Sequence, residues 1–203
     1  MKKLIYLLPV FIALSLNIYA QKNDSASLVA ETEKESRFNS IRAFEVESLA
    51  PMFISGGYHF AFCYRYQGFR LRASIINGGK YDAETAGLNN SANNFKRYYK
   101  TSPGFFLGYN IWKGLELYTY LELHNFEIEQ KATGNKKEIK STDIGGGISY
   151  QYFFGKYFYI QPGIHIYLRK ENSVNFGNAW YSIPKTDISP VIRIGLRFLE
   201  FSM

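Results

Sequence analysis

Apolar and polar side chains alternate with a period of two along most of the chain after residue 40. In segment 58–66 the even positions all carry Tyr or Phe, and the odd positions carry His59, Ala61, Cys63 and Arg65. Successive side chains of a β-strand point to opposite faces, so this period predicts a strand with one apolar and one polar face.

The same alternation recurs along the chain. It is clearest in five segments, 58–66, 69–75, 115–123, 158–166 and 188–198. Three weaker segments complete a set of eight, and they are 42–50, 105–111 and 144–152. A period of two that persists over eight segments predicts an all-β chain.

The connections between these segments alternate in length. Three are tight turns that each contain glycine, namely 67–68, 112–114 and 154–156. The others are predicted as loops over 51–57, 77–100, 127–140 and 169–186. Short turns at one end and long loops at the other are typical of an eight-stranded antiparallel up-and-down transmembrane β-barrel. Strands of about ten residues also suit a tilted bilayer span.

The first twenty residues have the pattern of a secretory signal peptide. Two lysines precede an apolar stretch that is too short to span a bilayer, and Ala20 precedes the polar Gln21. We therefore expect a signal peptide over 1–20, cleaved between Ala20 and Gln21. Residues 21–38 are polar and lack an apolar period, so they predict a periplasmic leader before a barrel over 39–203.

With its signal peptide, its alternating connections and its closing segment 193–198 (RIGLRF), the chain resembles the small eight-stranded outer-membrane β-barrel family, which is OmpX/OmpW-like within the porin superfamily. The closing segment resembles the terminal strand signal that barrel-insertion machinery reads. The resemblance implies a place in the cell outer membrane of a Gram-negative bacterium. It indicates location better than activity.

Alternation explains why the chain is 46% hydrophobic yet has a mean hydropathy of −0.21. The apolar face is expected to meet lipid, and the polar face is expected to fill an interior that is just wide enough for side chains. Equal numbers of acids and bases point inward and predict an interior charge network of Glu45, Glu47, Arg65, Arg70, Arg72, Glu116, Glu122, Asp143, Arg193 and Arg197. Buried charges need partners, so an open pore is disfavoured, and a narrow small-solute channel stays an alternative.

Counting residues outward from a hairpin centred on Lys113 predicts the register of two strands. Gly104 should face Glu122, and Gly108 should face Tyr118. Glycines at inward positions leave room for large side chains and allow the sheet to curve. Gly145, Gly147 and Gly163 are expected to make room in this way for tyrosines on the neighbouring strands.

The three long loops are predicted to be basic, with eleven bases against six acids. We expect them to contact outer-membrane lipids, including the phosphates of lipopolysaccharide, and to serve a structural or surface-interaction role. Loops that are merely solvated are the alternative, and the pattern names no surface ligand. Nucleic acid is not expected, because the basic residues are dispersed.

One polar group allows a catalytic alternative. The hairpin count places Ser102 across from His124. The 127–140 loop can bring Asp143 opposite His124, and the 154–156 turn sets His165 diagonal to Asp143. Nucleophile, base and carboxylate are the parts of an acyl-transfer site, so a lipid (acyl ester) hydrolase is the alternative function. However, any polar barrel core needs such contacts, and Ser102 lacks the glycines of a nucleophile elbow. We therefore expect no enzyme. Since the histidine spacing matches no ligand motif, we expect neither metal nor cofactor.

Overall fold

A computed structural model describes residues 38, 41–82, 95–177 and 180–202. The expected signal peptide, its cleavage site at Ala20 and Gln21, and the polar leader up to residue 37 lie outside these described residues. Within the described part of the chain, no helix has the length and hydropathy needed to cross a bilayer.

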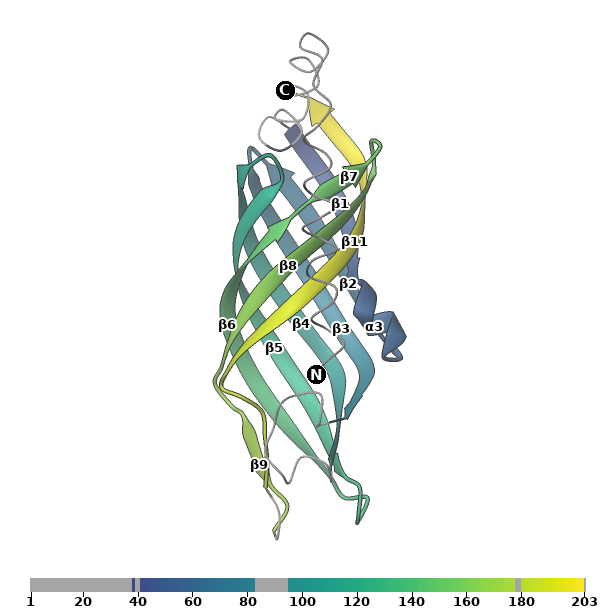
Figure 1. The fold of residues 1–203 in the computed structure, drawn as a ribbon, viewed down its shortest axis with the longest axis vertical. Helices are drawn as coiled ribbons and strands as arrows, with labels where there is room; N and C mark the ends of the chain where they lie inside the picture. The colour runs from purple at the N-terminus through teal and green to yellow at the C-terminus, as the bar shows by residue number, and fades with distance from the viewer. Residues whose placement is uncertain (1–37, 39–40, 83–94, 178–179, 203) are drawn as a thin grey trace, which may run out of the picture.

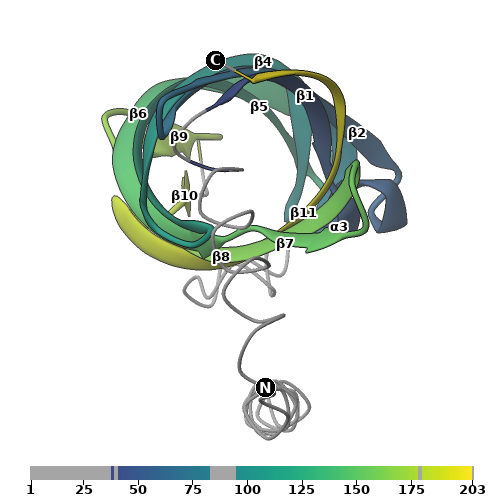
Figure 2. The same ribbon diagram turned by 90° about the horizontal axis from the view of Figure 1, so that it is seen from above.

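Eight long strands form a closed antiparallel barrel, as predicted (Figure 1). Each strand pairs with its neighbour in sequence, and the last strand pairs with both the first and the preceding long strand, which closes the ring seen in Figure 2. The long strands are β1 (Ile41–Leu49), β2 (Gly57–Tyr66), β3 (Phe69–Asp82), β4 (Phe95–Trp112), β5 (Leu115–Gln130), β6 (Lys136–Tyr150), β8 (Phe158–Arg169) and β11 (Thr186–Ser202). The short elements are α3 (Ala50–Ile54), β7 (Tyr152–Phe154), β9 (Ser173–Asn175) and β10 (Trp180–Ser182).

Tight hairpins define one end of the barrel, which we call the turn end. Gln67 and Gly68 join β2 to β3 with φ values of 46° and 83°, and Lys113 and Gly114 join β4 to β5 with 38° and 99°. Positive φ at both central residues marks the mirror-image turn that matches strand twist, and glycine adopts it without steric cost. The opposite end, where the longer connections lie, is the loop end.

The predicted register of β4 and β5 is confirmed. Gly104 pairs with Glu122 and Gly108 pairs with Tyr118. A Cβ added at Gly147 would overlap the Tyr118 hydroxyl. These glycines therefore leave interior space for large side chains on the neighbouring strand.

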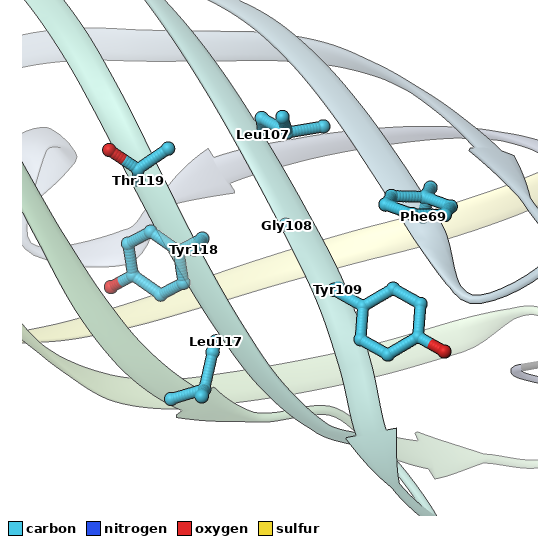
Figure 3. A pocket seen from close by; sticks show the side chains of 7 residues that line it. All are labelled: Phe69, Leu107, Gly108, Tyr109, Leu117, Tyr118 and Thr119. Carbon is cyan, nitrogen blue, oxygen red and sulfur yellow. The ribbon is translucent and has the colours of Figure 1, made fainter.

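The outer face of the barrel is apolar. Phe60, Leu71 and Phe105 each expose more than half of their surface. Shallow depressions separate such side chains, and Figure 3 shows one of about 290 Å³, lined mainly by Phe69, Leu107, Tyr109 and Leu117 around Gly108. An apolar outside and a polar inside are the reverse of a soluble barrel, so the strands form a transmembrane β-barrel.

Strands extend into three of the predicted loops, which corrects the sequence prediction. β3 and β4 extend into 77–100, β5 and β6 extend into 127–140, and β9 and β10 lie within 169–186. The remaining predicted loop, 51–57, holds most of α3.

The strands were missed because their alternation reverses phase. In β5 the outward residues Leu121 and Leu123 are exposed and apolar, whereas Phe126 and Ile128 on the inward face are fully buried. Outward side chains beyond the apolar belt meet water, so the apolar residues change sides. We call residues 95–100, 125–130 and 136–140 the loop-end extension.

The inner side of the loop-end extension has its own apolar core. The hairpin formed by β9 and β10 packs there through Tyr181 and Val174. Figure 2 shows both short strands within the outline of the ring, so they lie over the loop-end mouth. The buried members of this core are Phe95, Phe126, Ile128, Ile139, Tyr181 and Ile183.

Candidate functional site

The structure places all ten residues of the expected interior charge network inside the barrel, where each is buried. Arg70 of β3 is central to them. Its Nη2 lies 2.7 Å from Glu45 Oε2 and 2.6 Å from Glu47 Oε2, and its Nη1 donates to Gln161 Oε1 at 2.7 Å. Buried charges remain ionised when such pairing offsets the cost of removing them from water.

The two glutamates of β1 are shared among several arginines. Arg197 of β11 donates to Glu45 Oε1 from Nε at 2.9 Å and from Nη2 at 2.7 Å. Arg72 Nε lies 2.6 Å from Glu47 Oε1, and Arg193 Nε lies 3.3 Å from the same oxygen. Side chains from opposite sides of the barrel therefore meet at its axis.

Sequence reasoning missed the neutral members of this network. Tyr159 donates to Glu47 Oε2 at 3.1 Å, and Gln151 Oε1 accepts from Arg65 Nη2 at 2.7 Å. Tyr159 and Gln161 lie on the inward parity of β8, so the alternation alone identifies them. Their neutral side chains leave no mark in the balance of acids and bases that predicts the network.

The ion pairs around Arg70 fill the half of the barrel nearest the turn end, whereas Glu122 and Asp143 lie further toward the loop end beside His124. Phe38 lies in the turn half, with Arg65 5.5 Å from its ring centroid and Phe153 at 5.8 Å between centroids. In this half the interior is packed with paired charges and rings, as expected from the sequence.

The half nearest the loop end is only partly filled, which corrects the expectation of a uniformly filled interior. A cavity of about 360 Å³ lies there, with Met52, His59, Phe106 and Arg193 among the residues that line it. The cause is the short first strand. β1 ends at Leu49, while its neighbour β11 begins at Thr186 and extends further toward the loop end. Because β1 ends early, it contributes no inward side chains beyond Leu49 to this half of the barrel.

His124 stands between two carboxylates at the wall of this cavity. Its Nδ1 lies 2.8 Å from Asp143 Oδ2, and its Nε2 lies 3.4 Å from Glu122 Oε2. Asp143 is also held by the Ser141 hydroxyl and by Arg169 Nε, the latter at 3.1 Å. Arg169 was missed because the strand was expected to end before it.

Ser102 is not placed for the acyl-transfer arrangement. Its hydroxyl donates to the Lys100 carbonyl at 2.8 Å and accepts from the Asn125 backbone N–H at 2.9 Å. The register of β4 and β5 shifts between Tyr99 and Gly104. Ser102 lies within this shift, so the constant register that predicts its pairing with His124 does not hold there. The Ser102 hydroxyl is thus a backbone bridge between two strands.

His165 also lies elsewhere than expected. It pairs with Gly147, whereas Asp143 pairs with Arg169. Its ring contacts Arg193 Nη2 through Nε2, and its Nδ1 lies 3.1 Å from the Tyr167 hydroxyl. The β7–β8 pairs centre the turn on Lys156, so Asp143 pairs with Arg169, and His165 lies four residues along β8 from that partner. Among the described residues, no three His, Cys, Asp or Glu side chains form a metal-binding group.

Ion pairs cross the outer face of the loop-end extension. Lys136 Nζ donates to Glu127 Oε1 at 2.7 Å, and this hydrogen bond is the largest cause of the lowered pKa of Glu127. Lys100 donates to Glu138, which lowers the pKa of Glu138 and raises that of Lys100. These pairs link β4, β5 and β6 beyond the apolar belt, where the outer face of the strands is exposed to water.

The sequence matches no family model and no curated protein. Solved structures that resemble the fold include the N-terminal β-barrel domain of Pseudomonas aeruginosa OprF, with 12% identity and a TM-score of 0.41, over 79% of this chain and 98% of that one. Neisserial surface protein A gives the same identity and TM-score, over 78% of this chain and 96% of that one. At these values neither carries an argument about function, and the fold rests on the strand pairing. The closed eight-stranded antiparallel barrel with its apolar outer face fits the small eight-stranded outer-membrane β-barrel family.

Proposed function

We propose that the protein is a surface-interaction barrel of the outer membrane of a Gram-negative bacterium, and that its loop-end extension binds the anionic phosphates of lipopolysaccharide. The observation that carries this proposal is the phase reversal in β5. The reversal marks the end of the apolar belt, and beyond it the charged strands of the loop-end extension continue into water.

The charge of this sheet supports an anionic partner. With its turn 131–135, the loop-end extension holds seven basic and three acidic residues. The acids already have partners, because Glu129 lies 3.7 Å from Lys96, while Glu127 and Glu138 pair with other lysines. The net positive charge thus remains beside the level where lipid phosphates lie.

The interior supports a binding role over transport or hydrolysis. The buried pairs around Arg70 occupy the turn half of the barrel, where a solute would have to pass. The Ser102 hydroxyl is engaged by two backbone groups and is not directed at His124. Neither a through-channel nor an acyl-transfer centre is therefore part of the proposal.

A charge-reversal experiment tests the proposal. Lys131, Lys137 and Lys140 are changed together to Glu, and the refolded barrel is titrated with lipopolysaccharide micelles. We expect affinity to fall by at least about tenfold and its salt dependence to flatten, because surface charge attracts the phosphates. Binding is measured by the fluorescence of labelled lipopolysaccharide.

The matched control reverses Lys113 and Lys156, which lie at the turn end. This variant should bind lipopolysaccharide as the unchanged barrel does. Equal loss in both variants would indicate a general charge effect, and unchanged binding in the loop-end variant would refute the proposed surface.

A further inference from the structure

We propose that the cavity in the loop half of the barrel is a binding site for a small organic carboxylate with an apolar body. This site is separate from the outer surface of the loop-end extension and does not depend on its binding of lipopolysaccharide. At about 360 Å³ the cavity falls within the range of small-molecule sites.

Arg193 supplies the positive charge of the site. Its only carboxylate partner within the described residues is Glu47, which also pairs with Arg70 and Arg72. Arg70 and Arg72 have further carboxylate partners in Glu45 and Glu116, whereas Arg193 only shares Glu47 with them. Among the described residues, Nη1 of Arg193 is buried without a hydrogen-bond partner, which is costly unless a ligand supplies an acceptor.

The buried charges of the interior support the same conclusion. Among the described residues, six guanidinium side chains that are at most 5% exposed face five buried carboxylates, because Arg169 adds to the five expected arginines; Arg97, which also lines the cavity, is partly exposed. Asp187 also lies 3.7 Å from Arg169, but it is 40% exposed and water screens its charge. A bound monoanion would balance the interior.

Two histidines, His59 and His165, line the same cavity as Arg193. His59 Nδ1 accepts the Leu49 backbone N–H at 3.1 Å, so a neutral His59 carries its proton on Nε2 as a donor. His165 Nε2 faces Arg193 Nη2 and must therefore accept from it, which fixes the guanidinium. Glu122, the nearby acid on the wall, has Oε2 3.4 Å from His124 Nε2, but among the described residues that oxygen has no hydrogen-bond partner, so the ligand carboxylate must lie at Arg193 and away from Glu122.

The remainder of the wall selects an apolar body. Met52 of α3, Ile76 of β3, Phe106 of β4 and Val191 of β11 line the cavity, and all four are buried. Inorganic phosphate would leave these side chains against empty or wet space. An aromatic or short aliphatic carboxylate satisfies both the guanidinium and the apolar wall.

Calorimetric titration of the micelle-refolded barrel tests the site, with benzoate as probe and benzamide as its uncharged counterpart. We expect saturable benzoate binding and benzamide binding weaker by about tenfold or more, the usual loss for a charge-assisted hydrogen bond. The proposal would be overturned if the heat released on adding benzoate did not saturate, or if benzamide bound with equal affinity. Inorganic phosphate binding as tightly as benzoate would overturn the requirement for an apolar body.

Two matched variants locate the binding. Val191→Trp fills the cavity without removing any charged side chain and should abolish benzoate binding, whereas Val46→Trp on the lipid-facing side should leave it unchanged. The shift in gel mobility on heating establishes that each barrel is folded. Undiminished binding by folded Val191→Trp would place the probe elsewhere and refute the site.

Discussion

Glu45 shows how single residues hold the interior together. It is fully buried and lies within 3.5 Å of Arg65, 2.7 Å of Arg70 and 2.7 Å of Arg197. Each of these cations depends on it, so its loss leaves several charges uncompensated in a medium where water cannot reach them.

Glu45→Ala should therefore destabilise the barrel by about 3–5 kcal/mol, the range for breaking a buried ion pair. Urea unfolding of the refolded protein in lipid vesicles measures this. Glu200→Gln is the matched control, because Glu200 lies at the edge of the network, 4.0 Å from Arg197 and partly exposed. It should cost less than about 1 kcal/mol. Equal costs would contradict the account of the network.

Gly195 illustrates packing at the same scale. The three atoms nearest to a Cβ added there all belong to the side chain of Tyr159, and all lie within overlap distance. We predict that Gly195→Ala destabilises the folded barrel, and that its cost falls sharply in a Tyr159→Ala background. A double-mutant cycle by urea unfolding gives the coupling, and additive costs would show that Tyr159 is not the obstacle.

At the scale of elements, the sequence predicts which segments are strands but not how far they extend. Segment 58–66 is predicted almost to the residue, since β2 spans Gly57–Tyr66 and its outward side chains meet lipid throughout. β5 is predicted only over 115–123, because past Leu123 the apolar side chains move to the inner face. Phe126 and Ile128 are buried on the inner face because the outer face meets water there, so a single alternating pattern does not describe the whole strand.

The candidate site is likewise predictable only where the alternation keeps a constant phase and register. Inward parity identified the charged residues because parity holds through the bilayer. The position of Ser102 could not be predicted, because the register shift between Tyr99 and Gly104 leaves no mark in the alternation. The cavity arises from where β1 ends relative to β11, which is a difference between strands distant in sequence.

The ion pairs of the loop-end extension should make this element sensitive to acid. The folded pKa of Glu127 is lowered by Lys136, and that of Glu138 by Lys100, from an ordinary value of 4.5. Groups with a lowered folded pKa contribute stability above the unfolded value and lose it as the pH falls. Below pH 4.5 the extension should therefore open locally.

Hydrogen-exchange protection factors, corrected for intrinsic rates, measure this opening. Protection should fall in the amides of 125–130 and 136–140 on acidification, while the amides of 116–122 within the apolar belt keep theirs. Glu127→Gln should show reduced protection already at neutral pH. An extension equally protected at both pH values would show that its apolar core alone holds it.

At the scale of the whole molecule, the barrel is closed at the turn half and hollow at the loop half. This arrangement predicts that the purified barrel shows no sustained conductance in planar bilayers, because Arg70 and its partners occupy the axis. A steady ohmic conductance from the unmodified barrel would contradict the closed interior.

The central claim is that the barrel faces lipid with its apolar side and encloses its polar side. Spin labels placed singly along β2, in a Cys63→Ala background, test it most directly. Collision rates with oxygen, which is concentrated in lipid, and with a water-soluble nickel chelate are measured at positions 60 to 65. The account predicts high oxygen accessibility at Phe60, Phe62 and Tyr64, with little access for either reagent at the intervening positions. Uniform accessibility along the strand, or access of the nickel chelate to Phe62, would contradict it.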